Sequence, residues 1–409
     1  MDEKSTYVLN VSNDLGYGSI KGSLNDEKIM IPSVIARLTP ENTGLPKNFD
    51  HSDETTNYMQ HFMDNLDVTI SSSAITEQGR FLIGNAAVRS QLPLQSFDVN
   101  DFAGKSEDDL ALILTLSMIA GKTVKDAYEH EANLGNPLQV TVNMATALPV
   151  SEGKRGNVLE TYHDKFTGSN HTVTFHNFKD PITVQIHFRK VFVALEGETA
   201  QLMIKNAGSG LKQALLADFK HHYPELSNNI AAEDIIKDDN VLGVDIGEGT
   251  TDLVTILNGE VNTNASSSLP KGYGNVLQSA VEVLQAQQMN FDNRAQLKDY
   301  LSQPASPFAK KHQEKVRKVV YSQLEPFADQ IINAISAAVR QSGAGIELLF
   351  VYGGGSIPMA KESQLRKKIQ EKLQRFNGGD DIPVIWVSPK YAQVLNEMGL
   401  KLILSAIQS

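Results

Sequence analysis

The sequence predicts an α/β fold that is divided into two lobes. Segments with the patterns of strands and of helices alternate along most of the chain, which is typical of folds whose helices flank a sheet. The 409 residues are too many for one ordinary hydrophobic core, so two domains or lobes are expected. A short aspartate–glycine motif also occurs once in each half of the chain, which indicates that one architecture is repeated.

The first half of the chain begins with three predicted strands, which lie within 7–35 and are separated by a glycine-rich turn and by NDEK. The polar stretch over about 37–65 contains TPENTG and NFDHSDETTN, and we interpret it as a surface excursion. A strand leading into a helix is predicted over 75–90, a long helix over about 106–131 and a buried strand over 138–150.

The second half of the chain follows a polar insertion and alternates again between the two patterns. Its predicted elements are two strands at 180–188 and 190–197, a helix over about 199–221, a glycine hairpin after the acidic stretch 231–240, helices over about 273–288 and 309–341, a strand over 346–355, a helix over 360–376, and a final strand and helix over 383–389 and 391–407.

Charge and composition exclude several classes of function. A net charge of −11 disfavours wide, direct binding to nucleic acid, which requires clustered lysine and arginine. The chain has no cysteine, which excludes disulfides and thiolate metal sites and fits a cytoplasmic protein. The apolar stretch from Leu110, LALILTLSMIAG, is much shorter than the roughly 20 residues of a membrane span. We therefore expect a buried helix there and no association with a membrane.

The repeated motif is the most informative feature of the sequence. Asp14–Ser19 (DLGYGS) and Asp245–Thr250 (DIGEGT) share the pattern Asp-apolar-Gly-x-Gly-hydroxyl, and each copy lies between strand-like segments. One copy alone fits an ordinary tight hairpin, in which the glycines serve only the turn geometry. Two copies, one in each half, predict a pair of β-hairpins whose tips face one ligand.

The residue types at these tips suit a phosphate ligand with a metal ion. Glycines let a ligand approach the main chain, where successive N–H groups make a concave anion site. Ser19, Thr250 and Thr251 add hydroxyl donors, and Lys21 lies at the right alternation to reach a phosphate. Asp14 and Asp245 would repel phosphate unless a cation intervenes, and Mg²⁺ with a shell of water is the expected one.

Three other glycine-containing stretches could be mistaken for, or could add to, a phosphate site. AGKS at 103–106 and AGKT at 120–123 are not P-loops, because the first glycine of that motif would fall on Val99 and Leu116. We interpret both as helix-end residues. The triplet Gly353–Gly355 follows an apolar strand, and it predicts a flat backbone surface for the nucleoside end of the same ligand.

These motifs resemble those of the superfamily of actins, heat-shock chaperones and sugar kinases. Within it, the chain looks most like the plasmid-segregation actins of the ParM/StbA and Alp type. The first phosphate motif of actins, D-x-G-x-G-x-x-K, is matched from Asp14 to Lys21, and the second, D-x-G-x-G-x-T, from Asp245 to Thr251. The adenosine motif is matched by Gly354 and Gly355 with altered spacing. Two departures are Tyr17, where serine is common, and Ala147 in place of glycine.

The resemblance implies a two-lobed actin-like (ribonuclease H-like) fold. Each lobe would be a mixed five-stranded sheet flanked by helices, with the nucleotide in the cleft between the lobes. Lobe I would span 1–190 plus the C-terminal helix over about 390–409, with a small subdomain inserted over about 36–100. Lobe II would span 191–389, with a helical subdomain over about 270–345.

The resemblance also implies roles for particular residues. Glu196 would orient the attacking water, with Glu198 as the rival, and Asn396 would lie at a close-packed helix crossing. Asp14 and Asp245 would act in catalysis and hold Mg²⁺ through water. The residues implied to bind ATP, or possibly GTP, are Gly16, Tyr17, Gly18, Ser19, Lys21, Gly247, Glu248, Gly249, Thr250, Thr251, Gly353, Gly354, Gly355 and Ser356.

The function implied is an ATP (possibly GTP) hydrolase whose reaction is coupled to polymerisation. It would form a multi-stranded filament with copies of itself and move plasmid DNA in the bacterial cytoplasm through a separate centromere-binding adaptor protein. One alternative is a sugar or small-metabolite kinase on the same fold, which needs a catalytic base. Asp101, Asp108 and Asp109 are candidates for that base, although a loop and a helix start are the expected roles. A cell-shape or cell-division actin is the other alternative.

Overall fold

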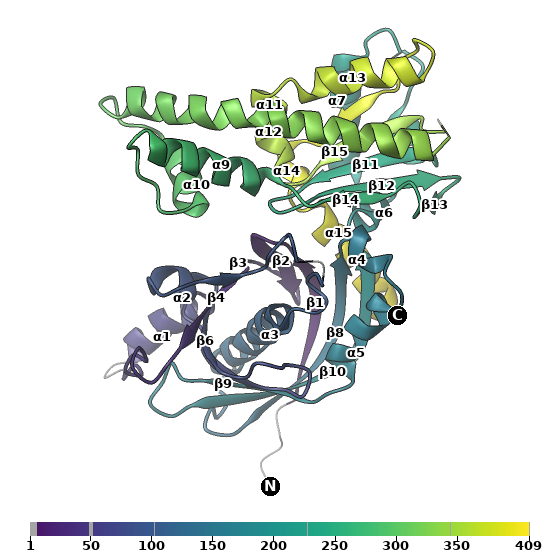
Figure 1. The fold of residues 1–409 in the computed structure, drawn as a ribbon. Coiled ribbons are helices and arrows are strands. Elements are labelled where there is room, and N and C mark those ends of the chain that lie inside the picture. Colours follow the sequence, from purple (N-terminus) through teal and green to yellow (C-terminus); the bar gives the residue numbers. More distant parts are fainter. Residues whose placement is uncertain (1–5, 49–51, 102, 227, 344, 409) are drawn as a thin grey trace. The chain divides into compact units, whose positions relative to one another are not determined.

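The computed structural model describes residues 6–48, 52–101, 103–226, 228–343 and 345–408, and the chain divides into two compact units (Figure 1). Unit 1 consists of 1–148, 152–195 and 397–409, and unit 2 consists of 149–151 and 196–396. The changeovers at 195/196 and 396/397 lie five to seven residues beyond the expected boundaries at 190 and 390. The reason is that β10 continues as one strand to Leu195 and that the final helix belongs to both units.

Unit 1 is built on a ten-stranded sheet with the order β3-β2-β1-β8-β10-β9-β5-β6-β4-β7. The strands are β1 (Thr6–Leu15), β2 (Ser19–Leu24), β3 (Glu27–Pro32), β4 (Val34–Leu38), β5 (Asp67–Ser71), β6 (Arg80–Ile83), β7 (Gln95–Ser96), β8 (Leu138–Leu148), β9 (His171–Phe175) and β10 (Ile182–Leu195). The helices are α1 (Ser52–Gln60), the 3₁₀ turn η1 (Phe62–Asp64), α2 (Asn85–Arg89), α3 (Asp109–Glu129), α4 (Val150–Gly153), α5 (Val158–Thr167) and α15 (Leu395–Gln408), of which α4 and α15 cross the unit boundary.

Helix α3 forms the centre of the core of unit 1. Asp108 caps its first turn by accepting a hydrogen bond from the N–H of Leu110 at 2.9 Å. Nearly every residue from Leu110 to Val124 is buried, as its continuous apolar sequence predicts. Along β8, alternate residues face opposite sides of the sheet, so Val140 and Val142 join the core around α3 while Ala145 and Ala147 pack against α15.

Unit 2 is built on a six-stranded sheet with the order β13-β12-β11-β15-β16, in which β14 also pairs with β12. The strands are β11 (Val241–Ile246), β12 (Thr251–Leu257), β13 (Glu260–Val261), β14 (Ser267–Leu269), β15 (Leu348–Tyr352) and β16 (Val384–Trp386). The helices are α6 (Glu198–Lys205), α7 (Ser209–His222), α8 (Ala232–Ile236), α9 (Tyr273–Ala286), α10 (Arg294–Ser302), α11 (Lys310–Gln341), α12 (Ser356–Glu362), α13 (Leu365–Phe376) and α14 (Pro389–Ala392).

The two units share one strand topology, which confirms the predicted duplication. In unit 1, β1 pairs antiparallel with β2 and parallel with β8, and β8 pairs parallel with β10. In unit 2, β11 pairs antiparallel with β12 and parallel with β15, and β15 pairs parallel with β16. The runs β3-β2-β1-β8-β10 and β13-β12-β11-β15-β16 therefore form matching five-stranded cores.

Several predicted elements require correction. The sheet of unit 1 has ten strands rather than five, because β9 pairs with β10 and continues the sheet through β5 into the segment expected to be an insertion. The predicted strands at 180–188 and 190–197 are one strand of 14 residues, in which a bulge between Phe188 and Lys190 preserves the pairing with β8. The predicted helix over 360–376 is instead two helices, α12 and α13, separated by the extended residue Ser363.

Several helices were missed in stretches that look polar. The insertion after β8 contains α5, which buries Tyr162 and Phe166. Unit 2 contains α10, which buries only Leu297 and therefore carries a weak helical pattern. The polar stretch 37–65 contains α1 and η1, and its residues 49–51 lie outside the described residues. Among the helices that the structure describes, none combines the length and the apolar character needed to cross a membrane.

Candidate functional site

The first motif forms the turn between β1 and β2 in unit 1. The N–H of Gly16 donates to the carbonyl oxygens of Asp14 and Ser19, each at 3.1 Å. A Cβ atom at Gly16 would lie 2.8 Å from the carbonyl oxygen of Ser19, so the turn requires glycine there. Ser33, which lies between β3 and β4, supports the turn with two hydrogen bonds. Its hydroxyl donates to the carbonyl oxygen of Gly16 at 2.7 Å, and its N–H donates to the carbonyl oxygen of Gly18 at 3.2 Å.

Asp14 and Lys21 lie directly opposite each other across this hairpin, so their side chains project from the same face. Asp14 is only 7% exposed and Lys21 is half-buried. Within the described part of the chain, neither side chain makes a hydrogen bond or an ion pair. Burying a carboxylate without a partner is costly, and such groups occur mainly where a ligand or ion supplies the partner.

The remaining predicted residues of the first turn, Tyr17 and Ser19, are half-buried. The ring of Tyr17 meets the ring of Phe97 edge-on at 5.9 Å between centroids. The ammonium group of Lys105 also contacts this ring, at 4.6 Å from its centroid. The side chain that replaces the family's serine is therefore held in place by neighbours within unit 1.

The second motif forms the turn between β11 and β12 in unit 2. The N–H of Gly247 donates to the carbonyl oxygen of Thr250 at 2.9 Å, as Gly16 does to Ser19 in the first turn. The hydroxyl of Thr250 donates to Asp252 at 2.8 Å, and the hydroxyl of Thr251 donates to the carbonyl oxygen of Lys271 at 2.9 Å. Both threonine protons are thus engaged within unit 2, and these hydroxyls brace the turn.

Glu248 and Gly249 occupy the tip of the second turn. The N-terminus of α9 packs directly on it, because the N–H of Gly274 donates to the carbonyl oxygen of Glu248 at 2.8 Å. The carboxylate of Glu248 faces Arg294 and Lys298 of α10, at 3.7 and 3.5 Å. Two cations that the sequence analysis did not predict therefore hold the Glu248 side chain, while Gly249 is buried.

The glycine triplet lies against the second turn within unit 2. The N–H of Gly355 donates to the carbonyl oxygen of Ile246 at 2.8 Å. Gly353 has φ of +91°, and a Cβ atom there would lie 2.2 Å from Oδ1 of Asp245. Because β11 and β15 are parallel neighbours, their carboxyl ends meet at one edge of the sheet and bring these two motifs together. Ser356 is fully buried and donates to the carbonyl oxygen of Gly353 at 2.7 Å.

Gly354 differs from its two neighbours, because it is partly exposed. The three atoms nearest to a Cβ at this position all belong to Gln393 and begin at 3.6 Å, which is an ordinary contact distance. The triplet therefore has two glycines that the fold requires and one that faces available space.

The two candidate glutamates differ in burial. Glu196 follows the end of β10 and is 8% exposed, whereas Glu198 is the exposed first residue of α6. Between them, Gly197 has φ of +81°, and a Cβ atom there would lie 2.4 Å from Cγ2 of Val254. The turn that carries Glu196 is consequently pressed against β12 of unit 2.

Asn396 joins that turn to the second motif. Its amide nitrogen donates to Oδ2 of Asp245 at 2.6 Å. Its amide oxygen accepts from the N–H of Gly197 at 3.2 Å and from the hydroxyl of Thr199 at 2.9 Å. The resemblance predicts Asn396 at a helix crossing but does not predict this bridge, which depends on residues about 150 to 200 positions away.

Tyr352 lies beneath the same group of residues. Its side chain is fully buried and its hydroxyl contacts the carbonyl oxygen of Gly197 at 3.4 Å. Burial, reinforced by the nearby carboxylate of Asp245, raises the pKa of Tyr352 well above its ordinary value. The phenol is therefore a neutral hydrogen-bond donor that supports the turn carrying Glu196.

The carboxylates at the two turns suit an Mg²⁺ ion that is held through water rather than directly. Over the described ranges, no group of three or more histidine, aspartate or glutamate side chains is arranged to hold a metal directly. The buried carboxylate of Asp14, which lacks a partner among the residues that the structure describes, fits a hard cation that retains its water. Asp245 has Asn396 at one oxygen and the backbone of Gly353 close to the other.

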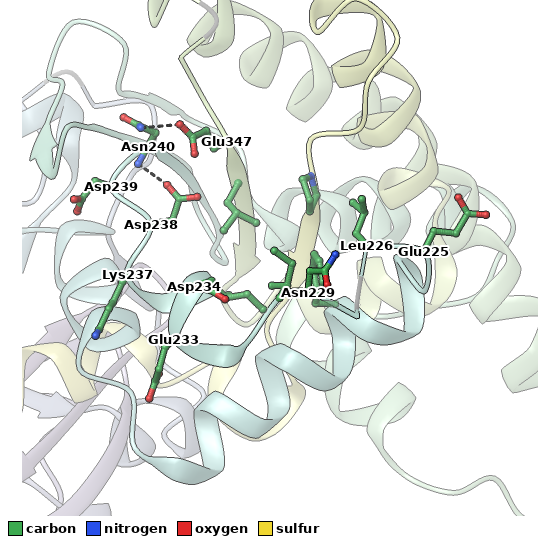
Figure 2. Close-up of a pocket in the computed structure, with 15 residues that line it drawn as sticks. Glu225, Leu226, Asn229, Glu233, Asp234, Lys237, Asp238, Asp239, Asn240 and Glu347 are labelled. Atoms are coloured by element: carbon green, nitrogen blue, oxygen red, sulfur yellow. Dashed lines mark hydrogen bonds between the residues drawn. The ribbon is translucent and has the colours of Figure 1, made fainter.

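A cavity of about 790 Å³ in unit 2 lies elsewhere, and no predicted site residue lines it (Figure 2). Its polar lining consists mostly of carboxylates, as Figure 2 shows for Asp234, Asp238 and Glu347. Burial raises the pKa of Asp238, and the neighbouring Glu347 adds to that effect. Such a lining repels polyphosphate, so the cavity is unsuited to a nucleotide.

Comparison with protein-family models finds two matches that lie one after the other along the chain. A model described as the N-terminal domain of actin-like proteins matches residues 12–198, which include the first turn and Glu196. A model described as the C-terminal part of an MreB-like archaeal actin homologue matches residues 243–365, which include the second turn and the glycine triplet. A search of curated protein sequences finds no match.

Comparison with solved structures finds proteins of similar fold over nearly the whole chain. The actin-like protein Alp7A is 14% identical, with 99% of this chain and 97% of that chain covered and a TM-score of 0.64. Bacillus thuringiensis ParM with ATP is 15% identical, with 98% and 99% covered and a TM-score of 0.58. An archaeal actin homologue is 16% identical, with 98% and 99% covered and a TM-score of 0.60. At these identities the likeness concerns the fold.

Proposed function

We propose that this chain, which matches models of actin-like proteins over residues 12–198 and 243–365, is a nucleotide-dependent, filament-forming ATPase of the ParM and Alp type that segregates plasmid DNA. The observation that carries the proposal is the pair of opposite charges at the first turn. Asp14 and Lys21 share one face of the hairpin, and neither has a protein partner among the described residues. A phosphate group with its cation would satisfy both side chains at once.

The nucleotide proposed is ATP, with GTP as the competing purine triphosphate. Bacillus thuringiensis ParM, one of the proteins similar in fold, has been solved with ATP, with AMPPNP and with ADP. The first turn, from Gly16 to Lys21, and the second turn, from Gly247 to Thr251, would bind the phosphates through backbone N–H groups and the Lys21 ammonium. Gly353–Ser356 would receive the nucleoside, with the partly exposed Gly354 as the point of contact.

Hydrolysis of a phosphoanhydride mainly requires positioning and neutralisation of charge. Mg²⁺, when bound, would supply that neutralisation and would be held through water by Asp14 and Asp245. Glu196 would orient the attacking water, because it is buried on a braced turn whereas Glu198 is exposed. Asn396 would fix the position of Asp245 relative to the turn that carries Glu196, through its three hydrogen bonds.

The cellular role proposed is transport of plasmid DNA by a filament of this chain. A multi-stranded polymer would grip DNA through a centromere-binding adaptor protein, since the net charge of −11 is unfavourable for direct contact with DNA. Hydrolysis coupled to polymerisation would then limit the lifetime of the filament.

One observation supports a filament-forming ATPase over a kinase. Each candidate base for a kinase already accepts a hydrogen bond from the backbone that holds local structure. Asp108 caps α3, Asp109 accepts from the N–H groups of Thr76 and Glu77, and Asp101 accepts from that of Ala103.

The test is sedimentation and electron microscopy of the purified protein with Mg²⁺ and ATP, with ADP, or with buffer alone. We expect filaments with ATP and release of phosphate after assembly.

Variants test the residues that carry the proposal. Lys21→Ala should abolish assembly, whereas Lys28→Ala, on the neighbouring β3, should assemble normally. Glu196→Ala should give filaments that persist because phosphate release slows by about 100-fold, while Glu198→Ala should behave as the parent. A protein that stays monomeric when saturated with ATP contradicts the proposal, and transfer of phosphate to a sugar in a coupled assay would favour a kinase.

A further inference from the structure

A buried lysine lies directly beneath the first turn. Lys105 belongs to the AGKS stretch, which does not form a P-loop, and its side chain is 1% exposed. Its ammonium group donates to the carbonyl oxygen of Leu15, the residue before Gly16, at 2.8 Å. The same ammonium group lies over the ring of Tyr17 at 4.6 Å from the centroid. One cation thus contacts the residues on both sides of Gly16.

We propose that Lys105 is a positioning residue for phosphate binding: its buried ammonium holds the first turn in its binding conformation and adds positive charge behind it. The inference rests on the proposed nucleotide function. It differs from the role of Lys21, which projects from the hairpin face, has no partner within the described part of the chain and is suited to direct contact with a phosphate. Lys105 acts instead through the backbone of Leu15 and the ring of Tyr17.

The backbone at Lys105 is held in place by a buried carboxylate. The carboxylate of Glu152, itself 3% exposed, accepts from the N–H of Lys105 at 3.0 Å and from that of Ser106 at 2.9 Å. Gly104 has φ of +77°, and a Cβ atom there would lie 2.3 Å from Cδ of Glu152. Two hydrogen bonds from main-chain N–H groups to one buried carboxylate therefore fix the position of the Lys105 backbone.

The contact with Tyr17 explains how the turn tolerates an aromatic residue where the resembled family often has serine. The Tyr17 ring is held by Lys105 on its face and by Phe97, which it meets at an interplanar angle of 77°. A cation over an aromatic face is attracted by the ring quadrupole, and the attraction grows when the pair is shielded from water. Removing the ammonium group would remove the contact with the face of the ring and the hydrogen bond to the Leu15 carbonyl oxygen.

The buried charge also has a direct electrostatic consequence. Charges inside a protein are screened much less than charges at its surface, so an ammonium under the turn attracts an anion bound above it. The effect should grow with the charge of the ligand. A nucleoside, which would bind at Gly353–Gly355 of unit 2 and carries no phosphate, should not sense Lys105.

The experiment measures calorimetric affinities of the full-length protein for Mg²⁺–AMPPNP and for adenosine. The variants are Lys105→Met, which keeps the length of the side chain without its charge, and Lys105→Arg, which keeps the charge. Lys122→Met is the matched control, since Lys122 is also buried in unit 1 but pairs with Glu27 and Asp126 of that unit. Circular dichroism on heating compares the folded state of each variant.

We expect Lys105→Met to weaken Mg²⁺–AMPPNP binding by about tenfold or more, with adenosine affinity unchanged and partial recovery in Lys105→Arg. Lys122→Met should lower the melting temperature without changing the ratio of the two affinities. If Lys105→Met changes both affinities equally, or matches Lys122→Met, the inference is wrong while the proposed function stands. If the parent protein binds no Mg²⁺–AMPPNP, the proposed function fails and the inference fails with it.

A second variant keeps the inference testable if Lys105→Met does not fold. Tyr17→Leu removes the half-buried ring and leaves the buried lysine in place. It should weaken Mg²⁺–AMPPNP binding several-fold without changing adenosine affinity, because the turn loses one of its two contacts with the ammonium group. An unchanged AMPPNP affinity in Tyr17→Leu would overturn the role assigned to the ring contact.

Discussion

The amide group of Asn396 donates to the carboxylate of Asp245 at 2.6 Å, and the next residue in the chain, Glu397, accepts a hydrogen bond from the hydroxyl of Ser12 at 3.0 Å. The first bond lies within unit 2 and reaches the end of β11. The second lies within unit 1 and reaches β1, two residues before Asp14. Consecutive residues at the unit boundary therefore anchor the strand that precedes each of the two turns.

Replacing Asn396 should separate hydrolysis from nucleotide binding. Asn396→Asp places a second carboxylate against Asp245 and also loses the amide donor, so we expect hydrolysis to fall by about 10-fold to 100-fold. Affinity for AMPPNP should change much less, because the turns themselves remain. Asn377→Ala, at an exposed position after α13, is the control and should leave both quantities unchanged. Equal losses of affinity and of rate would show that Asn396 only maintains the fold.

Neutralising Asp14 should stabilise the protein in the absence of ligand while weakening Mg²⁺-dependent binding. The carboxylate is 7% exposed and has no partner in the described residues, so Asp14→Asn should raise the free energy of unfolding by about 1 kcal/mol. Urea denaturation with and without Mg²⁺–ATP measures both effects.

The control for Asp14 is a carboxylate that has a partner. Asp67 accepts two hydrogen bonds from Arg80 at 2.7 Å, so Asp67→Asn should lower stability rather than raise it. If Asp14→Asn destabilises the ligand-free protein as Asp67→Asn does, Asp14 serves the fold and the proposed phosphate site loses its main support.

Adjacent glycines of the triplet should respond differently to alanine. Gly353 has φ of +91°, and its added Cβ would lie 2.2 Å from Asp245 and 2.4 Å from the carbonyl oxygen of Ile246. Gly353→Ala should therefore cost about 2 kcal/mol or more of stability. Gly354→Ala should cost little stability, since the nearest atom to its Cβ belongs to Gln393 at an ordinary 3.6 Å, and it should instead affect adenosine affinity. Thermal unfolding and calorimetry of both variants provide the comparison, and equal stability losses would contradict this account of the triplet.

Stability should fall on mild acidification because of a buried histidine in unit 1. His171 is fully buried, with Nε2 facing the carbonyl oxygen of Phe166 at 2.9 Å and Nδ1 facing the hydroxyl of Ser72 at 2.8 Å. Burial lowers the pKa of His171 below its ordinary value near 6.5. The unfolded chain consequently binds a proton first, so stability is fully present above that ordinary value and is lost as the pH falls below it.

The measurement is the free energy of unfolding between pH 7.5 and pH 5. His176 also has a pKa lowered by burial and by Arg80, so it adds to the same slope. His171→Gln should flatten the slope, whereas replacing the exposed His130 by glutamine should not. A slope that is identical in the parent and in His171→Gln would exclude His171 as the source.

Some features could be predicted from the sequence because they are local. The glycines at 16, 18, 247 and 249 stand between apolar runs that alternate as strands do, so both hairpins and the repeated topology followed from neighbouring residues. The buried helix α3 followed from its continuous apolar stretch. In contrast, α10 was missed because a helix that buries only Leu297 has almost no apolar pattern to detect.

What the sequence by itself determined is the pair of glycine hairpins, the buried helix α3 and the residue types at the two turns, because hydrophobic patterns and glycine act over a few positions. Only the tertiary structure decided which side chains support those turns. Lys105 reaches Leu15 across 90 positions and Asn396 reaches Asp245 across 151, and Asp14 has no protein partner in the described chain. Such contacts depend on how strands and helices pack in three dimensions, so no local pattern in the sequence could have revealed them.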